Sequence, residues 1–457
     1  MMHKFFVLIA GITMSISQHS TVASAQSVFD ATEQRPYSIP NADAPELAKL
    51  GSYNVGVVQM QFTDPARPNI AEALAGRNPI AERNVPVSIW YPTQEKGEGA
   101  VYTGKLNFRP GTRPSEVPET YQFKGMATEG AAPVSEGQFP LIVISHGYGN
   151  WANFLSYLGE NLASKGYVVA SIEHNDLPYT DLPTFNLSFG DTMLNRMRDQ
   201  RFVIEQLVAL AGSGEGLGTI INADQIGLIG YSMGGFGAMA SAGAGYMHQS
   251  PSLNQIPAPM LAGMLDNEQF LEPHPALKAV VAIAPWGAAP INRAWSPESL
   301  KSIDTPLLFI AGDHDDVSGY EDGIKWLFEG TTGADRHMLV YENGRHSIGG
   351  NPEPPFSHDY FDMTDWFNEP VWRRDRVVGI NQHFITAFMN MHLKGDGEAG
   401  SYLDVQPTRS NEGEWPIPPG GYTGGTYSSG DQDGKAYWKG FQRRWALGLQ
   451  MHKAKAE

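Results

Sequence analysis

The residues with the clearest chemical potential are Gly230-Tyr231-Ser232-Met233-Gly234, which place a serine between two glycines. An apolar run at 226–229 precedes them and small residues at 236–242 follow, a pattern typical of a strand, a tight turn and a helix. Such a turn requires glycine where side chains would clash. It would expose the Ser232 hydroxyl at a helix N-terminus, where negative charge is favoured. The stretch therefore predicts a nucleophilic serine; its alternative interpretation is a loop without chemistry.

A serine hydroxyl becomes a nucleophile only with a base beside it and an acid that orients the base. Where the serine lies on this kind of turn, the acid follows it along the chain and the histidine comes last. The acid candidates are Asp313, Asp315 and Asp316, which follow a predicted strand at 306–310. We favour Asp315 because it lies deeper in its loop, with Asp316 as the next choice. The alternative for each is a solvated turn aspartate.

The base must also follow a strand, because catalytic groups gather at the carboxyl ends of parallel strands. His346 does so, through a short glycine-containing loop after a predicted strand at 338–341. His337 precedes that strand, and His383 and His392 fall in a predicted helix at 380–393. His358 is the reserve candidate. The order of the residues thus predicts a triad of Ser232, Asp315 and His346.

Ester cleavage also needs two backbone N–H donors for the oxyanion. One would come from Met233, directly after the serine. The other would come from the loop His146-Gly147-Tyr148-Gly149, which follows a predicted strand at 141–145, with Tyr148 as the donor. The alternative is that this glycine loop only turns the chain.

The elements that must position these residues alternate along the chain. We predict strands at 55–62, 85–91, 141–145, 167–172, 226–229, 279–284, 306–310 and 338–341. Helical spacing marks 151–165, 193–211 and 380–393, and 173–191 is interpreted as a polar loop. This alternation predicts parallel strands with right-handed crossovers in a doubly wound sheet. The aromatic C-terminal segment, with Trp438, Phe441, Trp445 and Leu447, is expected to pack on the body.

Four stretches follow one another in residues 139–245: SHGYG at 145–149, LASKGYVVASIEH at 162–174, a predicted helix carrying Arg198 and Asp199, and IGLIGYSMGG at 226–235. In this combination they resemble dienelactone-hydrolase and platelet-activating-factor acetylhydrolase-like proteins. The acetylhydrolases carry their acid after the strand that follows the serine turn. This chain has Ala284-Pro285-Trp286 at that place.

Other features are similar to those of bacterial cutinases and polyester hydrolases. They are Gly147-Tyr148, the Ser-Met-Gly-Gly turn, Ala284-Pro285-Trp286 and the Ala-x-x-x-Asp loop that ends at Asp315. The resemblance implies that Asp315 is the acid and that Tyr148 and Trp286 clamp an acyl or aromatic group beside the serine. Core packing is the alternative for Trp286. This chain is longer than those hydrolases and lacks their disulfide cysteines.

The amino-acid composition limits the classes of molecule that this protein is expected to bind. Acidic residues outnumber basic ones by 49 to 32, and the formal net charge is −17. Such a chain repels nucleic acid and anionic membranes, so neither is a predicted partner. Cysteine is absent, which excludes a thiolate nucleophile, a disulfide and a thiolate metal site. We expect no metal and no organic cofactor, and the predicted partner is a small-molecule or polymeric ester substrate. The oligomeric state stays open.

The N-terminal segment has the three regions of a secretory signal peptide. A basic start at Lys4 precedes a mostly apolar stretch at 5–16, and Ala23-Ser24-Ala25 supplies small residues for cleavage before Gln26. A buried helix is the alternative. No later stretch has the ~18 apolar residues of a membrane-spanning helix. We therefore expect a secreted or periplasmic protein.

Together these features predict the α/β class and the α/β-hydrolase fold, with a doubly wound, mostly parallel sheet. Residues 26–457 would form a single domain with insertions near 93–138 and 246–275, the latter able to serve as a lid, and a C-terminal extension near 398–457. The expected function is that of an exported serine carboxylic ester hydrolase that works through an acyl-enzyme. The alternatives are a lactone, dienelactone or polyester hydrolase and, more remotely, a hydrolase-like binding protein without catalysis.

Overall fold

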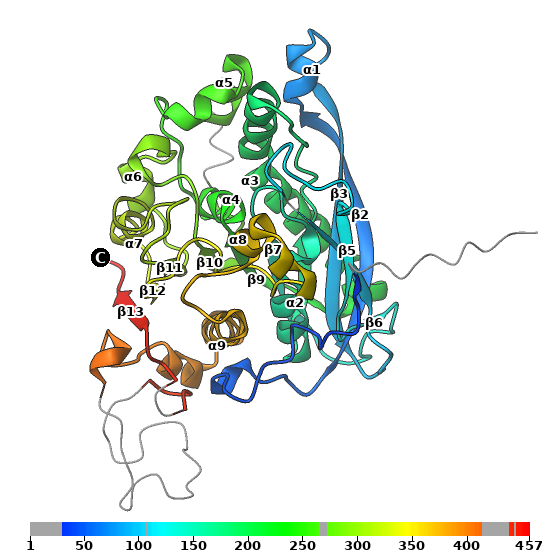
Figure 1. Cartoon of the computed structure of the whole chain (residues 1–457), viewed down its shortest axis with the longest axis vertical. Coiled ribbons are helices and arrows are strands. Elements are labelled where there is room, and N and C mark those ends of the chain that lie inside the picture. Colours follow the sequence, from blue (N-terminus) through cyan, green and yellow to red (C-terminus); the bar gives the residue numbers. More distant parts are fainter. Residues whose placement is uncertain (1–29, 107, 266–271, 414–437, 443–444) are drawn as a thin grey trace, which may run out of the picture.

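The computed structural model describes residues 30–106, 108–265, 272–413, 438–442 and 445–457 (Figure 1). The predicted signal peptide at 1–25 lies outside these ranges. So do part of the predicted insertion at 246–275 and part of the C-terminal extension.

A ten-stranded mixed sheet forms the centre of the molecule, in the order β13-β12-β11-β10-β9-β7-β8-β3-β2-β6. Strands β7 to β12 pair in parallel, and β2, β3 and β13 add antiparallel pairings. The strands are β2 (Asn54–Pro68), β3 (Ile80–Thr93), β6 (Thr128–Glu129), β7 (Phe139–Ser145), β8 (Val168–Ile172), β9 (Ile221–Tyr231), β10 (Leu277–Ile283), β11 (Leu307–Gly312), β12 (Arg336–Tyr341) and β13 (Leu449–Ala454). The predicted α/β-hydrolase sheet is confirmed.

The strand order reverses at β7. The chain passes from β7 to β8 on one side and then returns to β9 on the other side of β7. Crossovers between parallel strands are right-handed, so the helices of these two connections cover opposite faces. Crevices at such reversal points, outside the carboxyl ends of the strands, are where ligands bind in α/β sheets. The topology therefore singles out the ends of β7 and β9.

Helices cover both faces of this sheet. On one face α2 packs against α9, and on the other α3 packs against α4 (Figure 1). The helices are α1 (Ile70–Leu74), α2 (Ser156–Ser164), α3 (Leu182–Ser213), α4 (Met233–Ser241), α5 (Ala258–Leu265), α6 (Pro297–Lys301), α7 (Lys325–Gly330), α8 (Phe361–Phe367) and α9 (Arg374–Leu393). No helix in the described part of the chain is long and apolar enough to cross a membrane.

The start of α3 corrects the sequence interpretation. The stretch 173–191 was expected to be a polar loop, but α3 already begins at Leu182. Asp181 caps it: its side chain accepts the Thr184 N–H at 2.9 Å, and Thr184 Oγ1 accepts the Asp181 N–H in return. Pro183 lies in the first turn, where it costs no hydrogen bond. This capping box is a sequence signal that the expectation overlooked.

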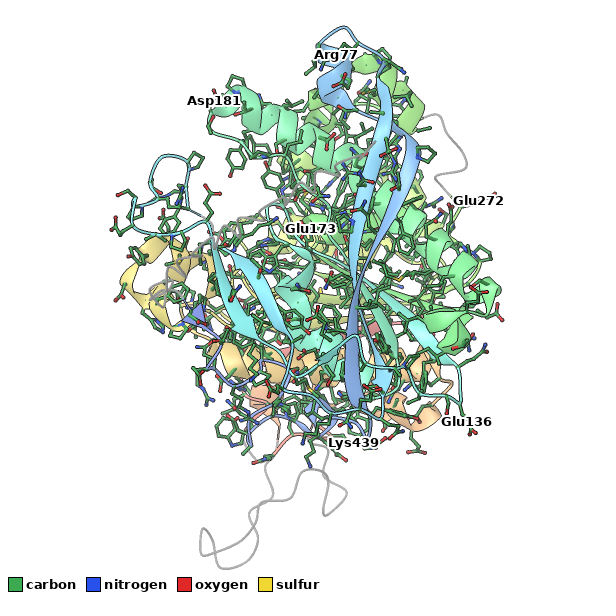
Figure 2. All side chains as sticks on the ribbon, turned by 90° about the vertical axis from the view of Figure 1, so that its right-hand side faces the viewer. Arg77, Glu136, Glu173, Asp181, Glu272 and Lys439 are labelled. Atoms are coloured by element: carbon green, nitrogen blue, oxygen red, sulfur yellow. The ribbon has the colours of Figure 1, made fainter. Side chains whose placement is uncertain are left out.

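The two N-terminal strands are longer than predicted. β2 and β3 form a hairpin that reaches far along the molecule, with Arg77 near its tip and Asp181 at the same end (Figure 2). The predicted insertion at 93–138 contains β4 (Val101–Lys105) and β5 (Thr120–Lys124), which form a small sheet with β1 (Asp30–Ala31).

The C-terminal segment does pack on the body. Trp438 and Phe441 are buried against Phe384 of α9, and β13 pairs with β12 at the edge of the sheet. Trp445 and Leu447 differ from the expectation, since both are exposed. The backbone pairing of β13 with β12 holds this segment to the sheet, so the side chains of Trp445 and Leu447 are not needed to anchor it.

Candidate active site

Ser232 lies on the turn between β9 and α4, with φ 52° and ψ −112°. A positive φ is strained for a residue with a side chain, and such strain marks functional turns. The neighbouring backbone leaves no space: a Cβ on Gly230 would lie 2.2 Å from the Gly234 oxygen, and one on Gly234 would lie 1.9 Å from the Ser145 oxygen. Glycine at both positions thus allows the turn and its close contact with the end of β7.

Three side chains from distant parts of the chain meet at this turn. His346 Nε2 lies 3.0 Å from Ser232 Oγ, and His346 Nδ1 lies 2.8 Å from Asp315 Oδ2. A carboxylate only accepts, so Nδ1 carries the hydrogen and Nε2 is free to accept the serine proton. The structure therefore brings together the three residues that the sequence predicts as a triad, with the tautomer that proton transfer needs.

Asp315 is fixed by its own loop after β11. Its Oδ1 accepts the N–H groups of Val317 at 2.9 Å and Ser318 at 2.7 Å. Burial alone would raise the pKa of the Asp315 carboxyl, but the contact with His346 and these amides outweigh it, and the pKa lies below its usual value. The carboxylate is thus ionised where it meets the imidazole.

The other acid candidates face elsewhere. Asp313 contacts His314 Nδ1 and accepts the Asn343 N–H, and Asp316 pairs with Arg345 at the surface. Geometry therefore separates three aspartates that are nearly equivalent in sequence.

The other histidines after the acid also lie away from the serine. His337 is in β12, His358 is an exposed residue near Glu353, and His383 accepts the Leu47 N–H inside the body. His392 packs against Phe388 on α9.

Two residues hold the loop that carries His346, and the sequence interpretation missed both. Glu369 Oε2 accepts the Arg345 N–H at 2.5 Å. Arg374 donates to the carbonyl oxygens of Ser347 and Gly350. Both side chains are nearly buried and come from the end of the α8 region and the start of α9. No local pattern could have linked them to His346, because the contacts are long-range.

The predicted oxyanion donors flank the serine. Met233 is the first residue of α4, and Gly147 approaches so closely that a Cβ there would lie 3.2 Å from Ser232 Cβ. Tyr148 follows Gly147 in the same loop. Met233 is therefore next to Ser232 in the chain, and the residue before Tyr148 lies against Ser232 in space.

The predicted wall residues belong to an aromatic cluster. The backbone N–H of Trp286 donates to the Ser232 carbonyl oxygen at 3.2 Å, which places the Trp286 backbone beside the turn. Phe189 of α3 touches both predicted walls, with ring centroids 5.2 Å from Tyr148 and 5.0 Å from Trp286. Phe185 and Tyr179 extend the cluster. The i, i+4 spacing of Phe185 and Phe189 was the missed signal, hidden by the loop interpretation of 173–191.

Two family models match parts of the chain. One is described as platelet-activating factor acetylhydrolase, isoform II, and matches residues 51–180; the other is described as PET hydrolase-like and matches residues 130–257. The second match contains the serine turn, and both contain β7 and the loop that follows it. The chain resembles esterases of the α/β-hydrolase fold. Each match covers less than half of the chain.

Individual proteins similar to this chain are distant relatives. A bis(hydroxyethyl) terephthalate hydrolase of Streptomyces coelicolor is 24% identical over 46% of this chain and 52% of its own length. A platelet-activating factor acetylhydrolase of Canis lupus familiaris is 31% identical over 33% of this chain and 31% of its own length. The chain thus spans about half or less of these relatives. A ferulic acid esterase structure from Streptomyces cinnamoneus is 20% identical, with a TM-score of 0.48, over 79% of this chain and 94% of that one.

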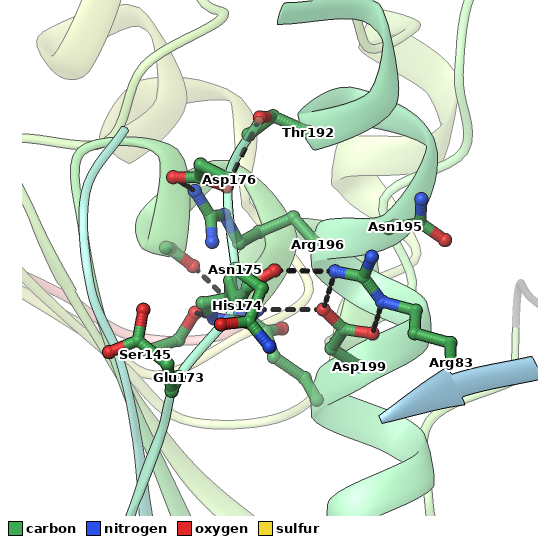
Figure 3. A network of polar contacts seen from close by, with 12 residues as sticks. Arg83, Ser145, Glu173, His174, Asn175, Asp176, Thr192, Asn195, Arg196 and Asp199 are labelled. Atoms are coloured by element: carbon green, nitrogen blue, oxygen red, sulfur yellow. Dashed lines mark hydrogen bonds and ion pairs between the residues drawn. The ribbon is translucent and has the colours of Figure 1, made fainter. Parts of the chain in front are cut away.

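A buried polar network contacts the loop that contains Gly147 (Figure 3). His174 Nδ1 donates to Asp199 Oδ2 at 2.9 Å, and Asp199 also accepts from Arg83 and Arg67. Burial opposes the ionisation of Asp199, but Arg83 and His174 reverse this and lower its pKa. A second pair joins Asp176 to Arg196 at 2.8 Å, and Asp176 accepts the Gly149 N–H. The network ties the hairpin β2–β3 and α3 to the loop beside Ser232.

Histidines inside the fold predict a loss of stability in mild acid. Burial lowers the pKa of His146 and His383 to about 3 and that of His174 and His337 to about 4. These rings stay neutral in the fold while the unfolded chain takes up protons below pH ~6.5, so stability falls as the pH drops from there. Each of these rings weakens the fold by roughly 1 kcal/mol for every pH unit below about 6. Asp191, whose pKa burial raises to about 6, opposes this loss, as do Glu160 and Glu369, whose pKa values burial also raises.

Urea unfolding followed by tryptophan fluorescence at pH 7.5, 6 and 5 measures this loss. We expect the free energy of unfolding to fall as the pH drops below 6, with a slope on the order of 1 kcal/mol per pH unit, because the titrating histidines outnumber the opposing carboxyl groups. The variant His383→Gln removes one of the titrating rings far from the serine and should reduce this slope. Equal stability at pH 7.5 and 5 would contradict the prediction.

Proposed function

We propose that this protein is a serine hydrolase that cleaves carboxylic esters through an acyl-enzyme. The observation that carries the proposal is the continuous chain from Ser232 Oγ to His346 to Asp315, with contacts of 3.0 and 2.8 Å, on a turn with positive φ. A nucleophile, a base and an orienting acid in these positions are what acyl transfer requires.

In the proposed reaction, His346 Nε2 takes the proton of Ser232 as Oγ attacks the ester carbon. Asp315 holds Nδ1–H and stabilises the imidazolium that forms. The N–H groups of Met233 and Tyr148 stabilise the oxyanion. His346 then gives the proton to the departing alcohol, and water, activated by the same base, releases the acid from Ser232.

The aromatic cluster supports a substrate with an apolar or aromatic group. Tyr148, Phe189 and Trp286 offer ring edges and faces beside the turn. The name of the Streptomyces coelicolor relative refers to an ester of an aromatic acid, which agrees with such a wall. Lactone, dienelactone and polyester substrates use the same chemistry. We further propose export, supported by the signal-peptide features of 1–25.

Covalent labelling tests this proposal against the rival of a binding protein without catalysis. A fluorophosphonate probe reacts only with an activated serine. We expect one phosphonyl group per chain, and peptide mass spectrometry should locate it on Ser232. A protein that is folded but not labelled, or labelled at another serine, would refute the assignment.

A further inference from the structure

The loop after β7 brings the backbone of Gly147 close to Ser232. Besides the 3.2 Å approach to Ser232 Cβ, a Cβ on Gly147 would lie 2.6 Å from Asn150 Oδ1, so any larger residue would have to displace the Asn150 side chain. Tyr148 comes next, and among the described residues its N–H has no hydrogen-bond acceptor. An N–H without a protein partner beside a nucleophile is available to a developing oxyanion.

Two donors hold the peptide that carries this N–H, since the Gly147 carbonyl oxygen accepts the Asn150 backbone N–H at 3.3 Å and also meets the ring of His146. His146 Nδ1 lies 2.7 Å from the Gly147 carbonyl oxygen, which can only accept, so Nδ1 carries the hydrogen. Nε2 is then the acceptor, and the His174 N–H donates to it at 3.2 Å. Both ring nitrogens are therefore satisfied in a neutral imidazole, and burial favours the neutral form.

The hydrogen bond at the Gly147 carbonyl also sets the direction of the Tyr148 N–H, because both groups belong to one planar peptide. In a trans peptide the C=O and the N–H point in opposite directions. A hydrogen bond that holds the Gly147 carbonyl toward His146 therefore turns the Tyr148 N–H away from that ring. The Asp176 contact to the Gly149 N–H at 2.9 Å fixes the next peptide, so the loop cannot rotate freely around Tyr148.

We propose that His146 is a positioning residue, whose Nδ1–H orients the Gly147–Tyr148 peptide so that the Tyr148 N–H meets the oxyanion formed on Ser232. This inference rests on the proposed function. His146 touches no substrate and transfers no proton. It acts through the peptide that it holds.

The residues behind His146 lock it in place. His174 is itself held by Asp199 through Nδ1, so its Nε2 accepts from Ser145 Oγ at 2.8 Å (Figure 3). Ser145, His174 and Asp199 repeat the order of contacts of a catalytic triad. Their exposed fractions are 0, 1 and 0%, however, and no substrate can reach them. We therefore assign this chain a structural role, as the rigid support of the loop.

Substitutions at His146 test the inference. His146→Leu removes the donor, and kcat for p-nitrophenyl acetate should fall about 100-fold, the lower range for losing one oxyanion donor. KM should change less than about twofold, because the oxyanion exists only after attack. His146→Asn keeps an N–H near the position of Nδ1 and should restore kcat to within about tenfold of the wild-type value. Affinity for phenylboronic acid, which forms a tetrahedral serine adduct, should fall and recover in parallel.

A matched control separates positioning from general loss of structure. His383→Gln also removes a buried histidine but lies away from the loop, so it should lower stability and leave kcat unchanged. Equal losses of kcat in His146→Leu and His383→Gln would overturn the inference. So would a higher KM at constant kcat, or a folded His146→Asn protein without recovery.

Crystal structures keep the test independent of the proposed function. If the wild-type protein neither hydrolyses esters nor reacts with a fluorophosphonate, the proposed function fails. The orientation of the Gly147–Tyr148 peptide can still be compared between the wild type and His146→Leu. A rotated peptide in the variant supports the inference, and an unchanged peptide overturns it.

Discussion

Replacement of Ser232 by alanine is expected to abolish ester hydrolysis, with a fall in kcat on the order of 10⁶ for p-nitrophenyl acetate. The reason is direct, since the hydroxyl 3.0 Å from His346 Nε2 is the proposed nucleophile. The fold should survive, because alanine meets the same backbone strain at φ 52° as serine does. Circular dichroism melting beside the kinetic assay checks both statements.

Ser213→Ala provides the control for this experiment. It changes an exposed serine at the end of α3 and should keep full activity. If the Ser232→Ala protein kept more than about 1% of the wild-type kcat, another residue would have to be the nucleophile, since removing a true nucleophile costs far more.

Replacement of Asp315 by asparagine should lower kcat on the order of 10⁴-fold. The change is nearly isosteric, and the amide oxygen can still accept the N–H groups of Val317 and Ser318. The amide nitrogen then faces His346 Nδ1 and donates to it. The hydrogen of the neutral imidazole moves to Nε2, which can no longer accept the proton of Ser232. Pre-steady-state acylation with p-nitrophenyl acetate measures this step.

Asp316→Asn is the matched comparison, because it removes the same charge one residue further on. Asp316 is about half exposed and pairs with Arg345, so the expected change in kcat is within about threefold. A larger loss from Asp316→Asn than from Asp315→Asn would show that the acid has been assigned to the wrong residue.

The sequence was a good guide where the signal is local. The glycines around Ser232, the buried strands and the polar residues at their carboxyl ends are all readable from short stretches, and they predicted the sheet. The start of α3 was missed although its signal is also local, in Asp181 and Thr184. That error concealed the helical spacing that brings Phe185 and Phe189 together.

Other parts of the site could not be predicted because their partners are far apart in the chain. Glu369 holds the loop of His346 from 24 residues away, and Arg83 reaches Asp199 across 116 residues. Such pairs form only when separate elements pack against each other. The sequence around Glu369 or Arg83 has no pattern that predicts which residue it will contact. The contacts of Ser145 with His174 and of His174 with Asp199 could not be predicted either, because they join separate elements and their burial follows only from the packed structure.

The sequence by itself determined which residue types could perform serine chemistry and in what order they follow the strands. Strand and turn signals depend on residues that are close together in the sequence, so they can be recognised in short stretches without the structure. The tertiary structure decided which of Asp313, Asp315 and Asp316 meets His346, because that depends on the path of the loop after β11. It also decided how the backbone beside Ser232 is held. Hydrogen bonds between β7, β8, α3 and the N-terminal hairpin set that geometry, and they exist only in the folded protein.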